Sequence, residues 1–70
     1  MATLSQSVAH LAENAIGSIR TFGEYGPMYQ VTGVAPRSAK GEEMVSILVI
    51  ESGETLDYEL EAVLADPLKP

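Results

Sequence analysis

Few side chains in this sequence have the chemistry for catalysis, and their spacing argues against it. With no cysteine, the chain has neither a thiol nucleophile nor a thiolate metal ligand, and its one histidine, His10, falls on the polar side of a predicted helix. The glycine-rich stretch 23–26 lacks the lysine and the hydroxyl residue of a phosphate-binding loop. The stretch 51–54 is too short for a calcium loop. We therefore predict no enzyme, no catalytic residue, no metal and no cofactor.

Carboxylates are the main ionisable groups, and they are concentrated in the second half of the chain. The ten Asp and Glu outnumber the four Lys and Arg, which gives a net charge of −6. Residues 41–68 contain eight of these acids and no base. Such a surface repels phosphate, so no direct nucleic-acid binding is expected, whereas a basic protein would be attracted to it. The alternative interpretation is that these acids only keep a small domain soluble.

Three of the four aromatic residues lie within eight positions, around a turn rich in glycine and proline. In one interpretation Phe22 and Tyr29 fill a small core and Tyr25 packs over the turn. In the other, Tyr25 stands exposed at the tip of the loop and anchors a protein interface, where tyrosine is often a hot spot. The second interpretation requires Tyr25 to be exposed in the free protein.

The elements that hold these residues follow from hydrophobic periodicity. Apolar residues at helical spacing predict an amphipathic helix over residues 3–16, with a capping box at Thr3 and Gly17 as its C′ residue. From Ser18 onward the alternation has the period of strands. The predicted fold is α+β and mainly β: an N-terminal helix, a four-stranded antiparallel meander that is barrel-like or two-layered, and a short helical turn. The expected strands are Ser18–Phe22, Met28–Val34, Met44–Ile50 and Thr55–Leu60, followed by the helical turn Leu60–Ala65.

The last hairpin has a register that can be tested by its side-chain pairs. A two-residue turn at Ser52-Gly53 sets Val49 opposite Leu56 and Ile47 opposite Tyr58, which leaves one face wholly apolar. A longer loop with a bulge at the glycine would shift this register, and that alternative stays open. The expected core is Ile19, Tyr29, Val31, Ile47, Val49, Leu56, Tyr58 and Leu60.

The second face of the sheet carries Leu48 and Ile50, which need some cover. The apolar stripe of the helix either covers them or pairs with a second copy, and a homodimer through this N-terminal helix is slightly favoured because a 70-residue chain builds only a small core. The stripe consists of Leu4, Val8, Leu11 and Ala15.

Three sequence segments together resemble a known group of proteins. They are IRTFGEYGPMYQV at residues 19–31, GETLDY at 53–58 and LADP at 64–67. The combination resembles an uncharacterised family of very short proteobacterial proteins that share an IRTFGEYGP-Y-V segment and a GE-LDY hairpin. The resemblance covers residues 17–67 and leaves out the first helix. It implies a compact β domain and no particular activity.

The predicted organisation is an amphipathic helix over residues 1–16 and a small β domain with an acidic C-terminal half over 17–70. No apolar run is long enough to span a membrane and no secretory signal precedes the helix, so we expect a cytoplasmic protein without membrane contact. The favoured function is a small protein-binding module, an antitoxin-like inhibitor of a basic partner. The alternatives are an anti-CRISPR-type decoy against a nucleic-acid-handling complex and a homo-oligomeric structural or regulatory protein. The predicted partner-binding residues are Tyr25, Asp57, Glu59 and Glu61.

Overall fold

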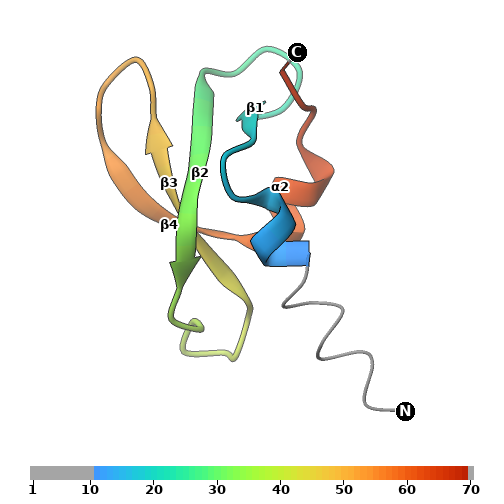
Figure 1. Cartoon of the computed structure of the whole chain (residues 1–70), viewed down its shortest axis with the longest axis vertical. Coiled ribbons are helices and arrows are strands. Elements are labelled where there is room, and N and C mark those ends of the chain that lie inside the picture. The colour runs from blue at the N-terminus through green and yellow to red at the C-terminus, as the bar shows by residue number, and fades with distance from the viewer. Residues whose placement is uncertain (1–10, 70) are drawn as a thin grey trace.

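A computed structural model describes residues 11–69 as one antiparallel sheet with two short helical segments (Figure 1). Residues 11–15 are helical, and the strands follow one another in the sheet in the order β1-β2-β3-β4. This arrangement confirms the predicted α+β, mainly β fold. The elements are β1 (Ile19–Thr21), β2 (Met28–Ala35), β3 (Met44–Val49), β4 (Thr55–Glu59) and α2 (Leu60–Ala65).

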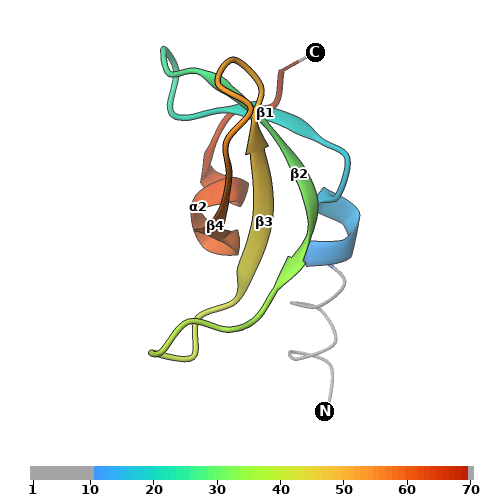
Figure 2. The same ribbon diagram turned by 90° about the vertical axis from the view of Figure 1, so that its left-hand side faces the viewer.

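The two helical segments lie beside each other on one face of the sheet, so the fold has two layers (Figures 1 and 2). Burial alternates along β3, where every second side chain enters the core, as expected for a strand with one covered face. The helical residues Ala12 and Ala15 and the α2 residue Val63 close that core from the other side. The buried cluster consists of Ala12, Ala15, Tyr29, Val31, Val45, Ile47, Leu60 and Val63.

The N-terminal helix does not cover the second face of the sheet with its described residues. Ala12 and Ala15 pack on the face that carries Ile47, whereas Leu48 points to the opposite face and is half-buried. The prediction that the helix covers Leu48 and Ile50 is therefore wrong for residues 11–15. Ile50 is 42% exposed. Gly17 ends the helix with a φ of 90°, as predicted. The expected capping box at Thr3 and the residues Leu4, Val8 and His10 lie outside the described residues.

The register of the last hairpin differs from the expected one by two residues. Ile47 lies opposite Leu56, and Val45 lies opposite Tyr58. The turn contains four residues, 50–53, because Val49 N–H donates to Glu54 O at 2.8 Å, and Gly53 closes the turn with a φ of 75°. A shift of two residues keeps every side chain on its predicted face, which is why the alternation alone did not reveal it.

The core also differs from the expected one at two positions. Leu56 is 41% exposed because it lies on the edge strand β4. Ile19 pairs with Gln30, so it belongs to the face opposite the core. Val45 and Val63, which are fully buried, take their places.

The C-terminal segment closes the outer edge of β1. Lys69 N–H donates to Ile19 O at 2.8 Å, and Thr21 N–H donates to Pro67 O at 3.2 Å. Arg20 and Leu68 form the bridge between these two bonds. Among residues 11–69, no helix is both long enough and apolar enough to cross a bilayer.

Candidate functional site

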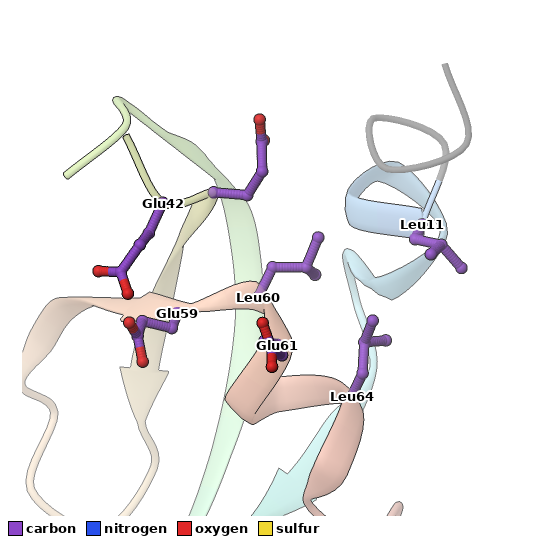
Figure 3. Close-up of a pocket in the computed structure, with 7 residues that line it drawn as sticks. Leu11, Glu42, Glu59, Leu60, Glu61 and Leu64 are labelled. Atoms are coloured by element: carbon purple, nitrogen blue, oxygen red, sulfur yellow. The ribbon is translucent and has the colours of Figure 1, made fainter. Parts of the chain in front are cut away.

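A concave surface lies where β4 passes into α2, and we call it the acidic groove (Figure 3). It encloses about 300 Å³ and combines an apolar floor with a rim of carboxylates. The floor consists of Leu11, Leu60 and Leu64, and the rim consists of Glu42, Glu43, Glu59 and Glu61.

The rim is assembled from three segments, and hydrogen bonds within the loop 36–43 hold the first of them in shape. Ser38 N–H donates to Glu42 O at 3.0 Å, and Glu42 N–H returns a bond to Ser38 Oγ at 3.1 Å. Arg37 forms an ion pair with Glu43. These contacts set Glu42 beside the last residue of β4, Glu59, as Figure 3 shows.

The apolar floor joins this loop to the two helical segments. Leu60 N–H donates to Glu43 O at 2.9 Å, which ties the start of α2 to the loop, and the Leu60 side chain is buried. Leu11 and Leu64 flank it and are 45% and 42% exposed. The floor therefore offers apolar surface to a ligand while its base belongs to the core.

Electrostatic repulsion is built into the rim. A hydrogen bond with the Glu42 side chain and repulsion from its charge raise the pKa of Glu59 above the ordinary value of a glutamate. Glu61 adds to this shift, and Lys40 opposes it. A cation brought to the groove would relieve this repulsion of Glu59, which the free chain carries.

The predicted partner-binding residues occupy two separate places. Glu59 and Glu61 lie in the groove, and Asp57 lies two residues before Glu59 on the same side of β4. Tyr25 lies beyond the start of β2, whereas Glu59 pairs with Met44 next to the end of β2. With a rise of ~3.3 Å per residue, the length of β2 separates the two places by roughly 20 Å. The structure thus groups the three acids and sets the tyrosine apart.

Tyr25 is 97% exposed at the tip of the loop that joins β1 to β2. The interpretation in which Tyr25 packs over the turn is therefore wrong, and the exposure that an anchor residue requires is present. The base of the loop is closed by a bond of 3.1 Å from Phe22 N–H to Pro27 O. A Cβ at Gly26 would lie 2.0 Å from Phe22 O, so no other residue fits there without moving the backbone. The loop presents Tyr25 from a tightly closed base.

The same loop is tied to the far end of the chain by Asp66, which belongs to the LADP segment. Asp66 Oδ1 accepts a bond of 3.2 Å from Gly23 N–H. Its Oδ2 accepts bonds from the hydroxyls of Tyr29 at 2.8 Å and Tyr58 at 3.2 Å. Its backbone oxygen and that of Val63 accept from Arg20 Nη1.

Around Asp66 the aromatic rings form one cluster. Phe22 lies 4.5 Å from Tyr29 and 5.3 Å from Tyr58 between ring centroids, and the two tyrosine rings meet edge-on at 5.6 Å. Burial and the Asp66 carboxylate raise the pKa values of both tyrosines. Tyr29 and Tyr58 therefore stay protonated and serve as hydrogen-bond donors.

The three sequence segments that carry the family resemblance thus meet at one place. Arg20, Phe22, Gly23 and Tyr29 come from the first, Tyr58 from the second and Asp66 from the third. The shared segments hold this part of the fold together, and Tyr25, which is 97% exposed, stays outside the cluster. The only sequence signal for this role of Asp66 is its position before Pro67 at the end of a helix. The described residues include no group of three or more His, Cys, Asp or Glu arranged to hold a metal ion.

Comparison with known proteins identifies a family of unknown function. The sequence model described as "Family of unknown function (DUF5397)" matches residues 6–69. An uncharacterized protein of Haemophilus influenzae is 39% identical over 51 residues, which are 73% of this chain and 81% of that protein. The matched range begins at residue 6, so it includes most of the helix predicted over residues 3–16, which the resemblance based on motifs leaves out.

Proposed function

This chain belongs to the family of unknown function DUF5397, and we propose that it is a small protein-binding module that binds a basic partner protein and inhibits it in the manner of an antitoxin. The observation that carries the proposal is the acidic groove, in which carboxylates surround an apolar floor. Neither feature alone would suffice, because exposed acids also serve solubility. Together they match the aliphatic stem and charged head of lysine or arginine.

The repulsion between Glu42 and Glu59 supports a cationic ligand over a neutral one. Like charges held side by side cost the free protein stability, and the raised pKa of Glu59 reflects that cost. A bound guanidinium or ammonium group turns this repulsion into attraction. A basic partner therefore gains binding energy from these carboxylates that a neutral partner does not. This difference makes the site specific for basic partners.

Tyr25 supplies the second contact of the proposed interface. An exposed tyrosine on a closed loop loses little conformational entropy when it is bound, which is typical of anchor residues. Because Tyr25 and the groove lie at opposite ends of β2, a partner that touches both must span roughly 20 Å. In the proposed interface the acids Asp57, Glu59 and Glu61 speed association and Tyr25 slows dissociation.

Affinity capture from the native host, followed by binding kinetics with the purified partner, tests the proposal. The double variant Glu42→Gln/Glu61→Gln removes two charges from the groove, and Glu51→Gln/Glu54→Gln removes two from the β3–β4 turn. Both variants have the same net charge. We expect the groove variant to associate more slowly and with a weaker salt dependence than the turn variant. Equal kinetics for the two variants, or a captured partner that is neutral or acidic, would contradict the proposal.

The same experiment separates the two alternatives. A decoy of the anti-CRISPR type binds a nucleic-acid-handling complex, so added nucleic acid competes with it. An antitoxin-like inhibitor is displaced by nucleic acid only where its partner also binds nucleic acid through the same face. A homo-oligomer gives a mass above that of one chain in light scattering without any partner.

A further inference from the structure

We propose that the outer edge of β4 accepts an extended segment of the partner as a fifth strand, in which basic side chains alternate with apolar ones. This inference rests on the proposed function, because it takes the partner to be basic. It adds the backbone geometry by which that partner is recognised. Four observations carry it: an open edge, its hydrogen-bond phase, its side chains and its charge.

Of the two edges of the sheet, the β1 edge is paired with another segment and the β4 edge, among the described residues, is not. The C-terminal residues 67–69 pair with the outer side of β1. Within residues 11–69, no segment pairs with the outer side of β4, which is the last strand of the sheet and lies at its left side in Figure 2. An exposed strand edge is a template for pairing with another chain.

The alternation of hydrogen-bonded and non-bonded pairs between β3 and β4 determines which backbone groups of β4 face its open edge. Val49 N–H donates to Glu54 O at 2.8 Å, and Leu60 N–H donates to Glu43 O at 2.9 Å, so residues 54 and 60 are bonded to the β3 side. Bonded and non-bonded pairs alternate along an antiparallel ladder. The backbone groups of Leu56 and Tyr58 therefore face β3, and those of Thr55, Asp57 and Glu59 face the open edge.

The side chains along this edge specify an alternating partner sequence. Asp57 and Glu59 share one face of the sheet, and both carry a carboxylate. Leu56 lies on the opposite face and is 41% exposed, because no neighbouring strand covers it. Residues of an added strand that lie beside Asp57 and Glu59 gain from being basic, and those beside Leu56 gain from being apolar.

The charge of the edge excludes a second copy of this chain as the occupant. Pairing of two β4 edges would set Asp57 and Glu59 of one chain beside the same acids of the other. Like charges directly opposite each other destabilise strand pairs. The edge thus avoids self-association and stays open to a strand of opposite charge.

A pair of peptides with the same composition tests the inference on the full chain. The probe is a short capped peptide in which lysine and valine alternate, and the control has its lysines and valines in two separate blocks. Amide hydrogen exchange measured by NMR reports the edge directly. We expect the alternating peptide to slow exchange at Thr55, Asp57 and Glu59 by about tenfold or more, while Leu56 and Tyr58, which already bond to β3, change little.

Methylation of the lysine backbone nitrogens in the alternating peptide provides the sharpest control. It keeps every side chain and charge but removes the donors that would bond to β4. Loss of binding on methylation supports strand addition. Equal binding of the methylated, alternating and block peptides overturns the strand-addition inference. If all three peptides bind the wild type equally but none of them binds the Asp57→Asn/Glu59→Gln variant, binding depends on charge alone. The proposed function then stands, and only strand addition is wrong. Absence of binding by any peptide overturns the inference as well, and the kinetics with the captured partner then decide the proposed function separately.

Discussion

The Tyr29 hydroxyl donates a hydrogen bond of 2.8 Å to Oδ2 of Asp66, although 37 residues separate the two. Tyr58 donates to the same oxygen at 3.2 Å. One carboxylate oxygen thereby joins β2, β4 and the end of α2. Because Tyr29 is fully buried, water cannot replace Asp66 as the acceptor for its hydroxyl.

Asp66→Ala removes this acceptor and is expected to lower the free energy of unfolding by ~1–3 kcal/mol, since it leaves the buried Tyr29 hydroxyl without a partner. Urea unfolding measures the loss. The matched control is Asp57→Ala, an exposed acid on β4, which should change stability by less than ~0.5 kcal/mol. In a double-mutant cycle, Tyr29→Phe should reduce the cost of Asp66→Ala. Equal stability of the Asp66 and Asp57 variants would show that the bonds to Asp66 contribute nothing.

Gly26→Ala is expected to unfold the protein or destabilise it by ~3 kcal/mol or more, because the new Cβ would lie 2.0 Å from Phe22 O, a backbone atom that cannot move freely. Thermal melting followed by circular dichroism measures the effect. Gly33→Ala is the matched control, since a Cβ there meets nothing within 4 Å. A Gly26→Ala variant as stable as Gly33→Ala would mean that the loop base is looser than this geometry requires.

Glu59→Gln is expected to stabilise the protein at neutral pH. Glu42 and Glu61 raise the pKa of Glu59 in the folded chain, so folding favours its protonated form. The stabilising contribution of that protonated form is present at acid pH and is lost as pH rises through the folded pKa. Urea unfolding across a pH series should therefore show an advantage for Glu59→Gln near neutrality that disappears below about pH 4, where glutamate is protonated in either state. Glu51→Gln in the β3–β4 turn serves as the control. A Glu59→Gln variant less stable than the wild type at neutral pH would contradict the repulsion.

Tyr25→Ala separates folding from binding. Since the side chain is 97% exposed, its removal should change the free energy of unfolding by less than ~0.5 kcal/mol. Affinity for the captured partner should fall by ~2 kcal/mol or more, mainly through faster dissociation. Surface plasmon resonance measures both rates, and Tyr25→Phe should keep most of the affinity if the ring is the anchor. Unchanged dissociation of the Tyr25→Ala variant would remove the tyrosine from the interface.

Periodicity in the sequence predicted the strands to within one residue at each end and the helical turn at its observed bounds, because alternation and Pro67 are local signals. These signals did not give the register of the last hairpin. That register depends on a four-residue loop, which Gly53 closes with a positive φ in the left-handed region. The register shift between Val31 and Gly33 in β2 was also not predicted, because alternation along one strand does not show how it pairs with its neighbour. Periodicity gives the face of each side chain and leaves its partner undetermined.

The candidate site was predicted in part. Exposed acids near the end of β4 follow from composition and alternation, but the groove needs Glu42 from a distant loop and Leu11 from the first helix. Only the packing of the two helical segments on one face of the sheet brings these together. Asp66 was missed because its donors come from three separate segments, and no local spacing connects them.

The pairing of the C-terminal residues with β1 also sets the order of events when the protein is made. β1 is among the first strands to be synthesised, yet Thr21 and Ile19 obtain their outer bonds only from Pro67 and Lys69. A growing chain that has not reached residue 69 leaves that edge bare. Contacts of such sequence separation slow folding, because a long loop must close before they form. The nascent protein therefore depends on residues 67–69 to cover the outer edge of β1, and until they are made the sheet has two open edges instead of one.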